Sequence, residues 1–67
     1  MQLPIMIPTH VAHCECVQGG NEKFMEMVPV RATSVAEAVR QVRLDPRRIR
    51  VKAVEKLGPP FTVTSIA

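Results

Sequence analysis

The pattern of apolar and polar positions predicts two early β-strands, at residues 10–17 and 23–32. In the second strand Phe24, Val28 and Val30 share one face, which Glu26 interrupts, and Met25 and Met27 share the other. The sequence Gly19-Gly20-Asn21 separates the two strands, and these residue types accept the positive φ angles of a tight turn. The pattern therefore predicts a β-hairpin. Pro29 cannot donate a ladder hydrogen bond, so we expect the second strand to lie at a sheet edge or to be bulged at that point.

A short helix is predicted after the hairpin. Ser34 and Glu37 have the spacing of a capping box, in which Ser34 accepts from the Glu37 amide and Glu37 reaches back. Helical spacing places a stripe of apolar residues on one side, namely Val35, Ala38, Val39 and Val42. A helix of about ten residues should end at Leu44-Asp45-Pro46, because the residue before a proline avoids the helical region. Only one face is apolar, so we expect the helix to lie across a sheet.

Alternation returns in residues 47–57, which predicts a third strand. We expect one side to carry Ile49, Val51 and Ala53, and the other to carry Arg48, Arg50 and Lys52. The sequence Gly58-Pro59-Pro60 then breaks the chain, and residues 61–66, rich in β-branched side chains, predict a last strand.

The predicted order is therefore β-β-α-β-β, which indicates an α+β fold. We expect a small antiparallel sheet of three to four strands with one helix packed on one face. The chain of 67 residues is predicted to form a single domain, residues 1–67, with an extended N-terminal arm at residues 1–8. This length excludes a dinucleotide-binding α/β fold and a barrel enzyme.

The N-terminal arm is a candidate interface because it places large apolar side chains between prolines, in the sequence Leu3-Pro-Ile-Met-Ile-Pro8. It could cover an open sheet edge or the core, or dock on a second protomer or another protein. The small core, the apolar arm and the edge strand marked by Pro29 are features that also favour a homodimer, and the sequence leaves the oligomeric state open.

Cysteine use and the N-terminus predict a cytoplasmic protein, or one in the host cytoplasm if it is phage-encoded. Cys14 and Cys16 would lie on the same side of a strand, at the limit of the separation that a disulfide can span, so we expect both to be reduced. The first eight residues lack the basic start of a signal peptide. The chain also lacks an apolar run near the roughly 18–20 residues that a membrane span needs, so we expect no membrane partner.

One cluster contains metal-ligand residue types: His10, His13, Cys14 and Cys16. Zinc takes four such donors, but usually from two separated segments that wrap the ion. On a strand, His13 would point away from the other three residues. The favoured interpretation makes the cysteines small core residues, so we predict no metal and no cofactor, with these four residues as weak candidates.

The chain shows no catalytic arrangement. Its carboxylates are scattered, both histidines lie close together on one strand, and no glycine-rich phosphate loop joins a strand to a helix. A chain this short is also expected to lack a sizeable pocket. We therefore predict that the protein is not an enzyme.

The charge is unevenly distributed. The net charge is +3, yet residues 1–30 carry one lysine against three glutamates, whereas residues 31–67 carry eight lysines and arginines against three acidic residues. Six of these cations form the candidate binding set: Arg40, Arg43, Arg47, Arg48, Arg50 and Lys52. A continuous surface of this kind attracts phosphate groups or acidic proteins, although a solvated basic face would show the same pattern. The chain has no Trp or Tyr, so nucleic acid would be bound through phosphates rather than by base stacking.

The segment Val28-Pro-Val-Arg-Ala-Thr-Ser-Val-Ala-Glu-Ala-Val39, followed by Arg48-Ile-Arg-Val-Lys-Ala-Val54, resembles the layout of small phage proteins. It is similar to certain type I-F anti-CRISPR proteins of nearly this length, and the likeness covers most of the chain. The resemblance implies a non-enzymatic inhibitor that sits on a Cas surveillance complex where target DNA would lie. It assigns that contact to the six cations of the candidate binding set. The Cys/His strand and the proline-rich arm have no counterpart in that family.

The leading hypothesis is therefore a phage or mobile-element inhibitor that binds a host CRISPR-type nucleoprotein complex through its basic surface and blocks access of nucleic acid. The alternative is an accessory protein that binds DNA or RNA directly and largely without sequence preference. Both require that the six cations converge into one patch.

Overall fold

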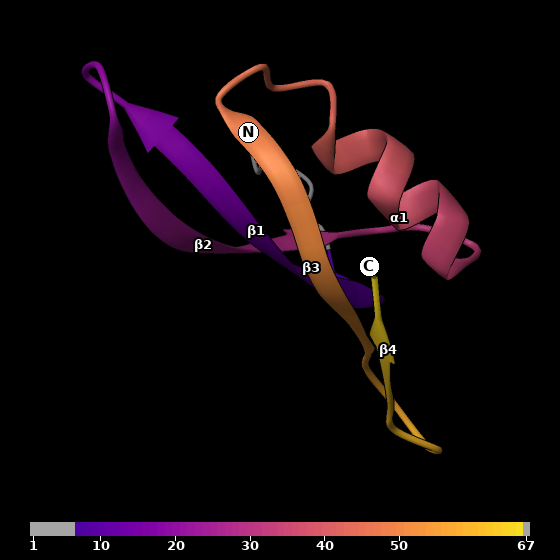
Figure 1. Ribbon diagram of the computed structural model, residues 1–67. Coiled ribbons are helices and arrows are strands. Elements are labelled where there is room, and N and C mark those ends of the chain that lie inside the picture. The colour runs from indigo at the N-terminus through magenta and orange to yellow at the C-terminus, as the bar shows by residue number, and fades with distance from the viewer. Residues whose placement is uncertain (1–6, 67) are drawn as a thin grey trace, which may run out of the picture.

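The computed structural model describes residues 7–66 and shows a four-stranded antiparallel sheet with one helix on one face (Figure 1). The elements follow in the order β1 (His10–Gln18), β2 (Glu22–Val30), α1 (Val35–Val42), β3 (Arg48–Lys56) and β4 (Thr62–Ser65). In the sheet the strands lie in the order β2-β1-β3-β4. This confirms the predicted α+β class and the position of the helix between the second and third strands.

The β1–β2 hairpin forms as the sequence predicts. The two strands pair from His10 opposite Val30 to Gln18 opposite Glu22 without a break. Gly19 and Gly20 in the connecting turn have φ values of 52° and 89°, which residues with a Cβ rarely adopt. Among residues 7–66, β2 is an edge strand whose outer groups have no ladder partner, and Pro29 is accommodated there.

The start of α1 confirms half of the predicted capping box. The Glu37 amide donates to Ser34 Oγ at 3.1 Å. The Glu37 carboxylate, however, accepts from the Thr33 hydroxyl at 2.6 Å rather than from the Ser34 amide. This hydrogen bond lowers the pKa of Glu37 below its usual range.

The helix ends at Val42, two residues before the predicted Leu44. The α-helical pattern stops because the Leu44 amide bonds to the Gln41 carbonyl, three residues back, at 3.3 Å. Pro46 stands where a longer helix would supply the amide that donates to the Val42 carbonyl, and proline has no such hydrogen. Arg48 Nη1 donates to this carbonyl instead, at 3.2 Å. A side chain from β3 therefore satisfies the end of α1.

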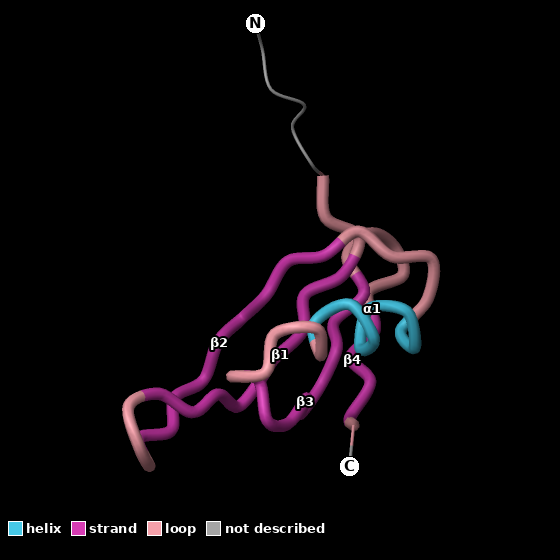
Figure 2. Tube along the Cα trace, turned by 90° about the horizontal axis from the view of Figure 1, so that it is seen from above, coloured by secondary structure: helices cyan, strands magenta, loops and turns pink. Residues whose placement is uncertain are grey.

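The core lies between α1 and the sheet and is built from small side chains. Its buried residues are Ala12, Cys14, Cys16, Val30, Ala32, Ala38, Val42, Val51 and Val54. Val35 and Val39 pack against this core with part of their surface exposed, so the predicted apolar stripe of the helix does face the sheet. Figure 2 shows the tip of the β1–β2 hairpin extending away from α1, and the helix covers only part of the sheet.

The predicted simple alternation of β3 is wrong. The register of β1 against β3 shifts twice, between His13 and Cys14 and between Glu15 and Cys16. Ile49 and Lys52 consequently have no direct partner in β1. Such bulges insert an extra residue and change which side of the sheet the following side chains face.

The bulges separate residues that the sequence placed together. Arg48 lies opposite buried Cys16, on the helix side, whereas Arg50 lies opposite Glu15, on the other side. We call that other side the open face. It consists of the odd-numbered residues from 11 to 17 in β1 and from 23 to 29 in β2, with Arg50, Ala53 and Glu55 of β3 and Val63 and Ser65 of β4.

Most of the predicted N-terminal arm lies outside the described residues. Within it, Ile7 is exposed and Pro8 is partly buried. Thr9 joins the sheet, because its amide donates to the Val30 carbonyl and its own carbonyl accepts from the Leu57 amide, both at 2.9 Å. Among residues 7–66, no helix is long and apolar enough to cross a membrane.

Candidate functional site

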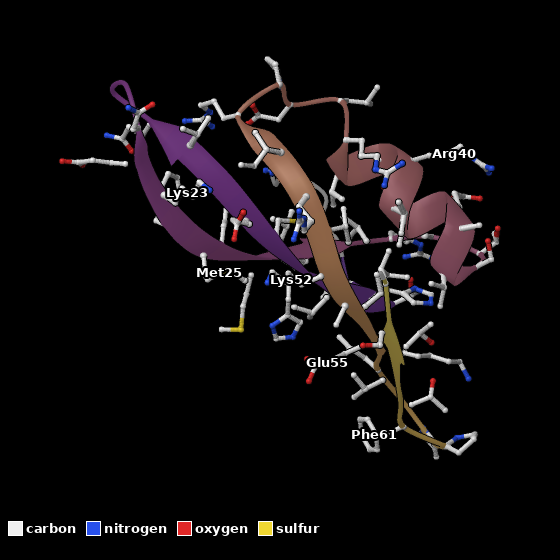
Figure 3. All side chains as sticks on the ribbon, in the orientation of Figure 1. Lys23, Met25, Arg40, Lys52, Glu55 and Phe61 are labelled. Carbon is white, nitrogen blue, oxygen red and sulfur yellow. The ribbon has the colours of Figure 1, made fainter. Side chains whose placement is uncertain are left out.

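The six cations of the candidate binding set are divided among α1, the following turn and both sides of the sheet. Arg40 and Arg43 lie three residues apart on α1 and its C-cap, and both are exposed. Residues at this spacing lie on the same side of a helix. In Figure 3, Arg40 projects from the side of α1 that is remote from the sheet, whereas Met25 lies on the opposite side of the sheet. These two arginines are the part of the set that the fold brings together.

Arg47 is held by a neighbouring carboxylate in the turn after α1. Its Nη2 atom lies 2.8 Å from Asp45 Oδ2, and its backbone amide donates to Asp45 Oδ1 at 3.0 Å. These hydrogen bonds to the charged form lower the pKa of Asp45 from 3.8 to about 2. The Arg47 side chain remains 62% exposed, but a negative charge lies beside it.

Arg48 is largely buried and bonds to groups inside the fold. Its Nε donates to Glu26 Oε1 at 3.0 Å, and its side chain is only 17% exposed. Cys16 Sγ donates to the same carboxylate oxygen at 3.6 Å. Together with the bond to the Val42 carbonyl, these contacts connect all the elements around the core except β4.

Arg50 and Lys52 are exposed, but Arg50 lies on the open face, away from α1. Lys52 lies at one of the two bulges of β3. The structure therefore does not gather the six cations into one continuous surface. It brings Arg40 and Arg43 together, gives Arg47 an acidic partner and buries most of Arg48. Their role in binding a partner stays a prediction.

Glu26 is the residue of this region that sequence reasoning missed. The alternation of β2 places Glu26 on the same side as Val28 and Val30, in the middle of a face expected to be apolar. A carboxylate in such a position needs a cation, because burial of an unpaired charge is costly. Arg48 is that cation, but only the pairing of β1 with both β2 and β3 brings the two residues together.

The His/Cys residues face both sides of β1, as the strand period predicts. Cys14 and Cys16 are free, buried thiols in the core, and burial raises the pKa of each. His10 is also buried, with Nδ1 2.7 Å from the Thr9 hydroxyl. His13 lies on the open face, 3.3 Å from Glu55 Oε2. Within residues 7–66, no group of three or more His, Cys, Asp or Glu side chains is arranged to hold a metal ion.

A shallow, open depression of about 480 Å³ lies between the end of β2 and the start of α1. Thr9, Arg31, Thr33 and Glu37 contribute its polar groups. The Thr9 hydroxyl donates to the Ala32 carbonyl at 2.9 Å and accepts from the Ala32 amide at 2.8 Å. Thr33 and Glu37 bond to each other. Most polar groups of this depression therefore already form hydrogen bonds within the protein.

The chain matches no protein-family model, no curated protein and no solved structure. A function must therefore be argued from the surfaces described above.

Proposed function

We propose that the chain is a non-enzymatic binding protein that engages an acidic or phosphate-bearing partner through the exposed side of α1. The sequence resemblance suggests the partner, a host CRISPR-type nucleoprotein complex, and a protein of phage or mobile-element origin would block its access to nucleic acid. The observation that supports this most strongly is the pair Arg40 and Arg43. Within the described part of the chain neither forms a salt bridge, and both are exposed.

These two arginines are not needed at the helix end. Cations in the last turn of a helix favour its negative end, and this alone could account for their presence. Arg48, however, already donates directly to the Val42 carbonyl at 3.2 Å. A guanidinium group presents a planar set of donors that fits carboxylate and phosphate oxygens, so Arg40 and Arg43 are available for a partner.

The buried state of the two cysteines supports a non-enzymatic role. Cys14 and Cys16 are buried with raised pKa values, whereas a reactive cysteine is partly exposed with a lowered pKa. His13 lies on the opposite side of the sheet from both thiols.

Direct binding to nucleic acid alone is the weaker candidate because too few cations converge. The logarithm of the affinity for duplex DNA falls with the logarithm of salt by about 0.9 for each phosphate neutralised. Six converging cations would give a slope of about −5.4, whereas Arg40 and Arg43 alone give about −1.8. A partner that also contributes protein contacts fits the smaller number better.

The test is binding of the purified protein to a purified type I-F surveillance complex. The charge-reversed variant Arg40→Glu/Arg43→Glu is expected to lose binding. The matched control Lys52→Glu/Lys56→Glu makes the same charge change at exposed positions of β3 and is expected to keep it. Failure of the wild-type protein to bind this complex would overturn the proposed partner. Equal losses in the two variants would overturn the assignment to α1.

A mobility-shift titration with duplex DNA distinguishes direct nucleic-acid binding from the proposed binding to a nucleoprotein partner. A salt slope near −5 for the wild-type protein would favour direct nucleic-acid binding and count against the proposal. A slope near −2 or no shift agrees with it.

A further inference from the structure

The open face of the sheet is apolar where a solvated face would be polar. Met25 and Met27 of β2 are 56% and 68% exposed, and Val63 of β4 is 67% exposed. An antiparallel sheet that faces water on one side normally alternates apolar and polar residues along each strand. Here β2 instead presents apolar residues on this side at three successive positions, Met25, Met27 and Pro29.

The open face carries a small net charge. Lys23 and Arg50 supply two cations, and Lys52 supplies a third from the bulge beside Ala53 (Figure 3). Glu15 and Glu55 supply two anions, so the formal charge is +1, whereas the whole chain carries +3. A surface that is nearly neutral and rich in exposed methionine does not fit a polyanion. It fits an apolar protein surface with matching charges at defined places.

The open face has the arrangement that a two-fold axis requires. Glu15, Met25 and Arg50 lie side by side in one row across the strands. The next row contains His13, Met27 and Ala53. Two copies can stack with these faces together. A two-fold axis between the copies, parallel to the two rows and midway between them, then places each row of one copy over the other row of the second copy.

We propose that this face binds a second copy of the chain, so that two sheets form an aligned sandwich. Two-fold dimers pair the same surface on both subunits, so each acidic position must meet a cationic or polar one. In this stacking Met25 of one copy meets Met27 of the other, and Glu15 meets His13. Arg50 of one copy lies over Ala53 of the other copy, beside the row that contains Glu55 of that copy.

The two helices lie on the outer sides of this dimer. Arg40 and Arg43 therefore remain exposed in both copies, and the dimer does not depend on the function proposed above. The four buried methionines form the centre of the interface, and their flexible thioether side chains adapt to one another in such contacts.

The experiment measures the molar mass of the full chain by sedimentation equilibrium over a range of concentrations. We expect a dimer for the wild-type protein. Met27→Lys places a charge at the centre of the interface and should weaken dimerisation by about tenfold or more, since two methionines lose their burial in a symmetric pair. Leu44→Lys is the matched control: Leu44 is 84% exposed on the other side of the molecule, and its variant should remain a dimer.

A charge swap tests the register of the two copies and does not alter the apolar centre. Arg50→Glu should weaken dimerisation, and Arg50→Glu/Glu55→Arg should restore it. A monomeric wild-type protein at every concentration overturns the proposal, as does equal dimerisation of the Met27→Lys and Leu44→Lys variants. Failure of the double variant to recover overturns the two-fold arrangement. Circular dichroism of each variant confirms that the comparison is between folded proteins.

Discussion

The guanidinium group of Arg48 bonds to the carboxylate of Glu26 at 3.0 Å and so joins β3 to the edge strand β2 across the intervening strand β1. Cys16 of β1 donates its thiol to the same oxygen atom. Arg48 also donates to the last carbonyl of α1, at Val42. One cation therefore connects the sheet with the helix end that Pro46 leaves without an amide donor.

Removal of this cation should destabilise the protein. Arg48→Met keeps most of the side-chain volume but leaves Glu26 and the Val42 carbonyl without their partner. We expect a loss of about 2 kcal/mol in the free energy of unfolding, the magnitude of a hydrogen-bonded charged group that loses its partner. Urea denaturation measures this value. The control Arg43→Met removes an exposed arginine that forms no salt bridge in the described part of the chain, and it should have little effect. Equal effects of the two substitutions would contradict the structural role of Arg48.

The N-cap of α1 gives a second prediction. Ser34→Ala removes the hydroxyl that accepts from the Glu37 amide at 3.1 Å, and should lower the free energy of unfolding by about 1 kcal/mol. Ser34→Gly should lower the free energy of unfolding by only a few tenths of a kcal/mol, because glycine leaves the Glu37 amide open to water. Thermal or urea unfolding of both variants tests the order. A Ser34→Gly variant that is less stable than Ser34→Ala would contradict it.

The lowered pKa of Asp45 leads us to expect that the stability of the protein depends on pH in the acidic range. This pKa is lowered from 3.8 to about 2 by Arg47, so the ionised carboxylate stabilises the folded state above pH 3.8. This contribution is lost as the pH falls from 3.8 towards 2, because the carboxylate is then protonated in both states. Asp45→Asn should therefore be less stable than the wild-type protein near neutral pH and should approach it at the acidic end. A stability difference that does not change with pH would contradict the assignment.

The two cysteines should be unreactive in the folded protein. Cys14 and Cys16 are buried, and burial raises the pKa of both thiols, so the thiolate that reacts is scarce and inaccessible. Ellman's reagent should label neither residue at neutral pH until urea unfolds the chain. Met27→Cys introduces a thiol at an exposed position and is the positive control under conditions that keep the protein monomeric. Rapid labelling of wild-type protein at the rate of this variant would be evidence against the buried arrangement.

Much of the fold could be predicted from local interactions in the sequence. The turn at Gly19-Gly20 needs positive φ values, Ser34 caps a helix through its own neighbours, and Pro46 keeps that helix from continuing. Each of these effects acts within a few residues along the chain. The order of the elements, the single apolar face of α1 and the opposite orientation of His13 and Cys14 follow from such effects together with the helical and strand periods.

Whether the six cations of the candidate binding set share one surface could not be predicted from local interactions. A strand period assigns Arg48 and Arg50 to one face only if the strand has no bulge, and a bulge depends on the strand with which it pairs. The ion pair of Arg48 with Glu26 likewise joins residues from two strands that are not neighbours in the sheet. The sequence by itself determined which elements form and where the chain turns, because those interactions are local. Only the tertiary structure decided which cations face solvent together and which are neutralised inside, because that outcome is set by contacts between distant segments.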